Sequence, residues 1–333
     1  MAKRKLNKHQ IKQVEETRNK KVSITAKHEQ LGEPQDGLVI TNFGRRLLVE
    51  GEDGELYNCS IRQHLGKLVA GDEVIWQTGL EKKSGVVTTH KPRRQELTRP
   101  GFRGQKRMVA ANIDILGIVA AVEPGIHPDM LDRYLVVAYQ LDLPVFIVIN
   151  KTDLVADEVH WEAIEELLIP YIKMGIDIYP VSADTNDGMD VLRELLSTKN
   201  SVFVGQSGVG KSSLIKTLSP EVEIKTNQLS QSTGLGKHTT TNSILYHLPE
   251  YNGSIGNIID SPGVRQFTPA ACGLHELEQA YQDFEPFLGK CKFNNCTHTI
   301  EPKCALIKAV EEGELDYGRF QSFQRLIKDF NET

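Results

Sequence analysis

A glycine-rich motif in the second half of the chain restricts the fold more than any other feature of the sequence. Residues 205–212 read GQSGVGKS, which matches the pattern G-x-x-x-x-G-K-[ST], and they follow the apolar run 201–204. This pattern requires a strand before it and a helix after it, so that backbone N–H groups and the helix dipole point at phosphate groups. We therefore expect an α/β domain with a mainly parallel sheet, which carries a phosphate-binding loop.

The loop also predicts how a nucleotide is held. Lys211 is expected to reach the β- and γ-phosphates, and Ser212 is expected to ligate Mg²⁺. The residues predicted to contact phosphate are Gly205, Gln206, Ser207, Gly208, Val209, Gly210, Lys211, Ser212 and Ser213.

A second motif, NKTD at residues 150–153, lies upstream of the phosphate loop and follows the apolar run 145–149. Ligands bind at the carboxyl ends of parallel strands, so we expect it at the same sheet edge. The Asp153 carboxylate can accept both N–H groups of a guanine edge, whereas adenine would leave that charge unpaired. The small residues of VSAD, after another strand, fit a loop whose N–H faces guanine O6. The predicted guanine-binding residues are Asn150, Lys151, Thr152, Asp153, Ser182 and Ala183.

The remaining parts of a GTPase lie downstream. In IIDSPG (258–263), Asp260 would hold Mg²⁺ through water, and the N–H of Gly263 would sense the γ-phosphate. Between the two motifs, STGLGKHTTT (232–241) fits a switch loop, in which Thr240 is the candidate Mg²⁺ ligand. The order of the motifs, with both base loops before the phosphate loop, predicts a circularly permuted GTPase domain.

Other segments flank this domain. Five short β-rich runs between residues 36 and 92 predict a small closed barrel of the OB-fold type. Residues 93–112 read as a basic linker, and helical segments are expected at 274–284 and 305–329. The predicted domains are a basic flexible extension (1–35), the barrel (36–98), the GTPase domain (104–272) and a mainly helical zinc-binding domain (273–333).

Three cysteines and a histidine cluster near the C-terminus, in the spacing Cys291-x4-Cys296-x-His298-x5-Cys304. Four sulfur and nitrogen donors so close together fit a closed tetrahedral Zn²⁺ site with a structural role. The alternative is that these are incidental core cysteines, as we expect for the buried Cys59 and Cys272. The odd total of five cysteines argues against a disulfide framework.

The net charge of −5 hides an uneven distribution of charge. Residues 1–31 and residues 91–107 each carry a net charge of +6, which favours a polyanionic partner contacted at defined places. The alternative is a solubilising tail and an ordinary charged linker. No apolar run is long enough to span a bilayer, and no secretory signal or lipidation motif is visible. We therefore expect a cytoplasmic location without membrane contact.

The motifs NKTD, GQSGVGKSSL, GLGKHTTT and DSPGVRQF, together with the Cys/His set, resemble one family over nearly the whole chain. This is the RsgA or YjeQ family of circularly permuted GTPases that depend on the small ribosomal subunit. The resemblance implies a factor that binds this subunit and its rRNA and hydrolyses GTP to GDP late in subunit maturation. It also implies that rRNA stimulates turnover, which times release of the factor, and it strengthens the zinc assignment. A monomer is the default expectation.

The residue that positions the attacking water is not obvious. Val264 stands where Ras-like enzymes have a glutamine, so unaided hydrolysis should be slow. His238 is the candidate catalytic residue, and the family resemblance points to it too; Gln266 is a weaker candidate. Two other functions remain open: an RNA-binding scaffold that holds guanine nucleotide without turnover, and an ATP-using enzyme, which Asp153 disfavours.

Overall fold

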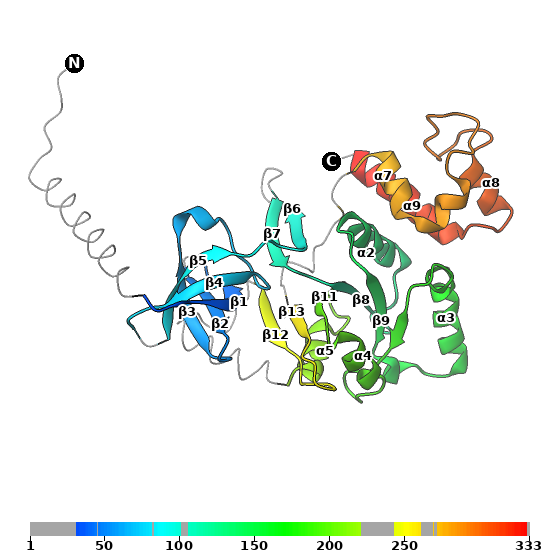
Figure 1. Ribbon diagram of the computed structural model, residues 1–333. Coiled ribbons are helices and arrows are strands. Elements are labelled where there is room, and N and C mark those ends of the chain that lie inside the picture. The colour runs from blue at the N-terminus through cyan, green and yellow to red at the C-terminus, as the bar shows by residue number, and fades with distance from the viewer. Residues whose placement is uncertain are drawn as a thin grey trace, which may run out of the picture. The chain divides into compact units, whose positions relative to one another are not determined.

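The computed structural model describes residues 31–44, 46–81, 83–100, 106–220, 243–260, 269 and 272–331 (Figure 1). The chain divides into two compact units. The first contains residues up to 68 together with 72–92, and the second contains residues 69–71 together with those from 93 onward. Within the described ranges, no helix combines the length and the apolar character that a membrane span requires.

The first unit is a closed five-stranded barrel, which confirms the predicted OB-fold. The strands follow the order β1-β2-β3-β5-β4, and β1 also pairs with β4, so the sheet closes on itself. The β3–β5 pair is parallel and the other pairs are antiparallel. The elements are β1 (Pro34–Asn42), β2 (Arg46–Gly51), β3 (Leu56–Ile61), the 3-10 turn η2 (Gln63–Leu65), β4 (Glu73–Thr78) and β5 (Ser84–His90).

Trp76 fills the centre of the barrel. Its side chain is fully buried, and its indole N–H donates to the carbonyl of Asp36 at 3.1 Å. Gly37 lets β1 pass this ring, since a Cβ there would lie 2.7 Å from Trp76 Cδ1. Cys59 belongs to the same apolar core, and burial raises the pKa of its thiol to about 12. Cys59 is thus the buried core cysteine that the sequence predicts, whereas Cys272 is only half-buried.

The second unit contains a six-stranded sheet in the order β10-β9-β8-β11-β13-β12. Its pairs are parallel except for β12 with β13. Every residue of the central strand β8 is buried, as an apolar strand covered on both faces requires. The predicted α/β domain is confirmed. Its elements are β8 (Ile115–Ala121), α2 (Pro128–Gln140), β9 (Val145–Asn150), η4 (Thr152–Leu154), α3 (Glu158–Lys173), β10 (Ile178–Pro180), α4 (Met189–Leu196), β11 (Asn200–Val204), α5 (Lys211–Leu218), β12 (Ile244–His247) and β13 (Asn257–Asp260).

The segment predicted to be a basic linker is instead an antiparallel hairpin. Strands β6 (Glu96–Pro100) and β7 (Lys106–Ala111) pair with each other in a separate two-stranded sheet. Leu97 and residues 109–111 are buried, so the ends of the hairpin away from its turn are apolar. The lysines and arginines near the turn concealed this pattern in the sequence.

The C-terminal part is mainly helical, as predicted, but its helices are shorter. Its elements are α7 (Leu274–Ala280), the 3-10 helix η6 (Gln282–Phe287), α8 (Ala305–Glu311) and α9 (Tyr317–Asn331). The expected helix 274–284 ends early, and η6, which contains Pro286, follows it. The expected helix 305–329 is interrupted near Gly313, whose φ of +74° is left-handed. The aromatic side chains of Tyr281, Phe284 and Phe323 pack together in the core.

Candidate nucleotide site and metal centre

The phosphate loop lies between β11 and α5, in the context that the motif predicts. Gly205, Gly208 and Gly210 all have positive φ angles, of +148°, +90° and +88°. A Cβ at Gly205 would lie 2.2 Å from the carbonyl oxygen of Val119, and a Cβ at Gly210 would lie 2.3 Å from Asn150 Nδ2. The positive φ angles, together with the close backbone oxygen at Gly205 and the close side-chain amide at Gly210, favour glycine at both positions.

Lys211 begins α5 and folds back over the loop. Its Nζ donates to the carbonyl oxygens of Gly205 and Gln206, both at 2.6 Å. Ser207, Gly208, Ser212 and Ser213 are exposed, and Val209 is buried beneath the loop. The loop thus combines a lysine, the hydroxyls of three exposed serines and the N-terminus of α5, which is an arrangement suited to an anion.

Asn150 connects the two predicted base loops to the phosphate loop. It ends β9, is buried, and its Nδ2 donates to the carbonyl of Val209 at 2.9 Å. Its Oδ1 accepts the backbone N–H of Ala183 at 3.2 Å. One amide therefore holds three segments that are distant in sequence, and the structure brings the predicted guanine and phosphate residues together.

The side chain of Asp153 is exposed beside this junction. The hydroxyl of Ser182 donates to Asp153 Oδ1 at 2.5 Å, and the same hydroxyl oxygen accepts the backbone N–H groups of Asp184 and Thr185. The N–H of Thr152 donates to the carbonyl of Val181 at 3.2 Å. Lys151 is half-buried, and its left-handed φ of +63° turns the chain away from β9. The carboxylate is thus oriented from one side and accessible from the other.

The predicted Mg²⁺ and switch residues are only partly described. Asp260 ends β13, and β13 pairs in parallel with β11 through Ile259 and Val202, so Asp260 lies at the sheet edge that carries the phosphate loop. His238, Thr240 and Gly263 lie outside the described residues, as do Val264 and Gln266. Their roles stay predictions.

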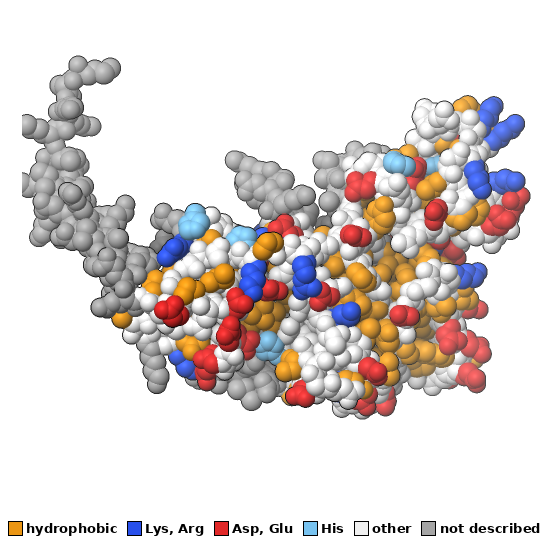
Figure 2. Space-filling view, viewed as in Figure 1, with side chains coloured by type: hydrophobic (Ala, Val, Ile, Leu, Met, Phe, Trp, Pro, Cys, Tyr) orange, Lys and Arg blue, Asp and Glu red, His pale blue; other side chains and the backbone are white. Residues whose placement is uncertain are grey.

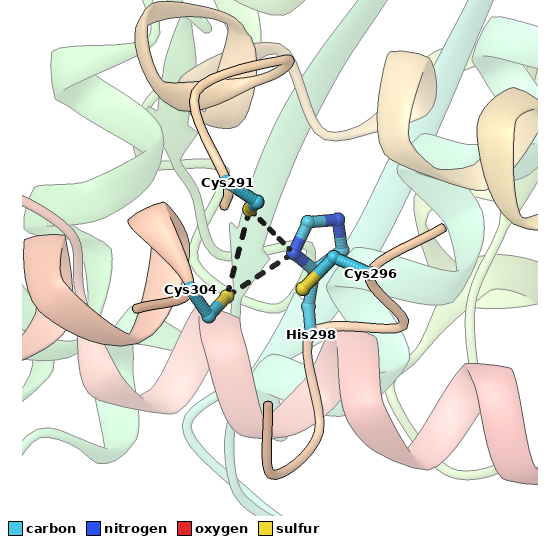
Figure 3. Close-up of side chains that lie close together, drawn as sticks. All are labelled: Cys291, Cys296, His298 and Cys304. Carbon is cyan, nitrogen blue, oxygen red and sulfur yellow. Dashed lines mark hydrogen bonds between the residues drawn. The ribbon is translucent and has the colours of Figure 1, made fainter. Parts of the chain in front are cut away.

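The predicted metal ligands form one compact cluster (Figure 3). The ligand atoms of Cys291, Cys296, His298 and Cys304 all lie within 4.8 Å of one another. Cys291 Sγ and Cys304 Sγ are 3.9 Å apart, and His298 Nδ1 is 3.2 Å from Cys304 Sγ. Around a tetrahedral Zn²⁺ with bonds of about 2.3 Å, sulfurs lie about 3.8 Å apart, so the donors fit one zinc ion.

The same part of the molecule contains a buried charged cluster that the sequence analysis missed. Arg319 of α9 is buried and donates to Asp283 through two nitrogens, at 2.6 and 3.1 Å, and to the fully buried Asp132 of α2. Tyr171 of α3 donates to Asp132 at 2.9 Å, and the guanidinium lies 4.4 Å from the ring centroid of Tyr281. In the sequence, Arg319 is an arginine beside Phe320 and Phe323 in a helical segment, and this pattern is too weak to predict its partners.

Comparison with known proteins decides the family. A family model described as RsgA GTPase matches residues 90–269. A protein of Haemophilus influenzae (strain PittGG) named small ribosomal subunit biogenesis GTPase RsgA is 42% identical, over 100% of this chain and 97% of its own. The chain belongs to the RsgA GTPase family. An Actinobacillus succinogenes relative of the same name is 41% identical, over 100% of this chain and 98% of its own.

Solved structures agree with this membership of the RsgA family. The crystal structure of YjeQ from Thermotoga maritima matches with a TM-score of 0.68 and 31% identity, over 90% of this chain and 98% of its own. YloQ, described as a circularly permuted GTPase, matches with a TM-score of 0.68 and 27% identity, over 90% of this chain and 96% of its own. The chain is therefore a GTP hydrolase of the permuted type, which confirms the interpretation of its motif order.

Proposed function

We propose that this chain binds the small ribosomal subunit and hydrolyses GTP to GDP during late maturation of that subunit, as a cytoplasmic monomer. The observation that carries the proposal is the extent of the match. Relatives named small ribosomal subunit biogenesis GTPase align along the whole chain, including the barrel and the Cys/His segment. GTP hydrolysis alone requires neither of these parts, so their presence supports a partner larger than the nucleotide.

In this proposal the junction at Asn150 holds the base loops in register with the phosphate loop. The Asp153 carboxylate accepts the N–H groups of guanine, and the hydroxyl of Ser182 keeps it oriented. Adenine would leave that carboxylate unpaired, which gives the preference for guanine. Lys211 neutralises the β- and γ-phosphates, and it must leave the two carbonyls that it contacts here in order to do so.

The ions complete the proposed site. Mg²⁺ would supply charge neutralisation at the phosphates, and the residues that would hold it are Ser212, Thr240 and Asp260. The N–H of Gly263 would face the γ-phosphate, and His238 would position the attacking water. Zinc would hold the C-terminal domain together without taking part in hydrolysis, because all four donors are protein side chains.

Contact with rRNA is proposed for the basic surfaces. Residues 1–31 and 91–107 are strongly basic within an acidic chain. In the C-terminal part, Lys290, Lys292, Lys303 and Lys308 are exposed, and Figure 2 shows Lys and Arg side chains on the surface of this part. Such surfaces favour phosphate contacts with folded RNA. Stimulation of turnover by this contact would time release of the factor. The proposed domain boundaries are 1–35, 36–98, 104–272 and 273–333.

The deciding experiment is GTP turnover by the purified chain, alone and with isolated small ribosomal subunits, at two salt concentrations. We expect a slow basal rate that the subunit raises by about tenfold or more, an effect that higher salt weakens. The matched control is Asp153→Asn, which should bind xanthine nucleotides in preference to GTP and respond to the subunit only with XTP. Tight GTP binding without any stimulation would contradict the proposal and favour a nucleotide-holding scaffold.

A further inference from the structure

His298 is held from three directions, and two of these contacts come from residues that are not metal ligands. Its Nδ1 faces the sulfurs of Cys291 and Cys304, at 3.6 and 3.2 Å. Its Nε2 lies 2.9 Å from Glu278 Oε1, and its carbonyl accepts from Gln324 at 3.0 Å. In Figure 3 the ring nitrogen that faces the sulfurs and the one that points away are both visible.

This geometry determines which tautomer of the imidazole is useful to a metal. If Nδ1 binds the ion as a neutral donor, the proton must be on Nε2, and it then donates to the carboxylate of Glu278. Ligating histidines commonly donate their second N–H to a carboxylate, which fixes the ring and makes the nitrogen a stronger donor. Both side chains are largely shielded, with exposed fractions of 5% for His298 and 14% for Glu278, so water competes poorly for this bond.

Among the described residues of helix α7, no side chain binds Glu278 as closely as His298 does. His275 Nδ1 lies 3.4 Å from Oε2, but the His275 side chain is 82% exposed. Helix α7 is fixed by the buried side chains of Leu277 and Ala280, which directs Glu278 toward the zinc loop. The ligands come from residues 291–304, whereas Glu278 comes from α7, the first described helix after the D-x-x-G segment.

We propose that Glu278 is a positioning residue for the Cys/His metal centre, which accepts the Nε2–H of His298 and ties α7 to the zinc loop. This inference rests on the proposal that the cluster binds zinc. It adds a fifth residue to the centre from outside the ligand-bearing loop. Loss of the carboxylate should leave all four ligands in place and still weaken metal binding, because the imidazole can rotate and change tautomer.

The test measures zinc affinity of the full-length chain by competition with a chromogenic chelator. Glu278→Ala should bind zinc about 10- to 100-fold more weakly than the unmodified chain. Glu278→Gln should lie between the two, since its amide oxygen still accepts the N–H. Glu276→Gln is the matched control, because this exposed glutamate lies on the same helix, and its affinity should be unchanged.

A second measurement separates positioning from general destabilisation. Nitrogen-15 NMR of the zinc-loaded chain should show a slowly exchanging Nε2–H on His298, and that signal should exchange faster in Glu278→Ala. Affinities within twofold of the unmodified chain, with unchanged exchange, would overturn the role of Glu278. Absence of zinc binding by the unmodified chain would instead overturn the metal assignment. If the alanine variant does not fold, the glutamine variant decides between these outcomes.

Discussion

The second unit contains two largely buried polar clusters that are built on different principles, one within its C-terminal part and one between that part and helices α2 and α3. The Cys/His cluster takes its four donors from one loop, residues 291–304. The arginine cluster, which comprises Arg319, Asp283, Tyr281, Asp132 and Tyr171, takes its members from α9, the region of η6, α2 and α3. The first can hold a loop closed, whereas the second joins the C-terminal helices to helices α2 and α3 of the α/β domain. The order of the 291–304 loop therefore depends on the Cys/His cluster, whereas attachment of the C-terminal helices depends on buried ion pairs and hydrogen bonds.

The energetics of the two clusters also differ. Metal–ligand bonds add binding free energy to folding directly. A buried ion network gains little over an apolar replacement of the same shape, because desolvation of the charges offsets their attraction. Burial raises the pKa of Asp132, and the charge of Arg319 opposes that rise. Removal of a single member of the arginine cluster should therefore lower the free energy of unfolding more than replacement of the whole cluster by apolar residues would.

If the Cys/His cluster binds zinc as proposed, removal of the ion should have the largest effect. Structural zinc sites have apparent binding free energies of about 10–16 kcal/mol, so Cys304→Ala or chelation should open the loop and expose residues 272–331 to protease. GTP affinity should stay near its original value, because the described nucleotide residues lie at the edge of the sheet and outside residues 272–331. Limited proteolysis and nucleotide binding measure the two effects. Cys59→Ala is the control, and it should lower barrel stability without changing zinc content.

Arg319→Ala should have the second largest effect. It leaves Asp132 buried without its cation, which typically costs about 3–5 kcal/mol. The C-terminal helices should then detach from α2 while zinc stays bound. Hydrogen exchange of α9 and α2, together with urea unfolding, would show this. The double variant Arg319→Met with Asp132→Asn should recover part of the loss, and a double variant no better than Arg319→Ala would contradict the network argument.

Alkaline pH should destabilise the folded chain through the two buried tyrosines of the arginine cluster. Burial first, and then the charge of Asp132, raises the pKa of Tyr171 and Tyr281 above the ordinary value of 10.0. Above pH 10 the unfolded chain loses these phenolic protons and the folded chain keeps them, so stability falls by up to about 1.4 kcal/mol per pH unit for each phenol. Their contribution is complete below pH 10 and is lost as pH rises through the folded pKa values.

Tyr171→Phe tests this pH dependence, because it removes one of the two phenols. Urea unfolding of the zinc-loaded chain at several pH values above 9 should give a shallower decline for this variant. Tyr317→Phe, at an exposed position of α9, should keep the original slope. Equal slopes in all three chains would show that the arginine cluster does not hold its phenols neutral.

The two clusters also differ in how far the sequence predicts them. Four ligands within 14 residues form a pattern that the chemistry of zinc explains, and Asn150 and Lys211 are likewise found from local motifs next to apolar strands. Arg319 has partners near positions 132, 171 and 283, and only tertiary packing brings these together. The β6–β7 hairpin was missed for a related reason, since the many Lys and Arg residues of 91–107 concealed the short apolar segments around Leu97 and residues 109–111, which are buried only in the folded chain.

The surface ion pairs between α2 and α9 should contribute least. Arg325 pairs with Asp129, with exposed fractions of 48% and 46%, and the half-buried Arg133 pairs with Asp329, with exposed fractions of 24% and 46%. Exposed pairs are each worth about 0.2–1 kcal/mol, and salt screens them. A double-mutant cycle on Arg325 and Asp129, in low and high salt, should give a small coupling that salt reduces. A coupling as large as the loss from Arg319→Ala would mean that surface charge, and not the buried arginine, attaches the C-terminal helices.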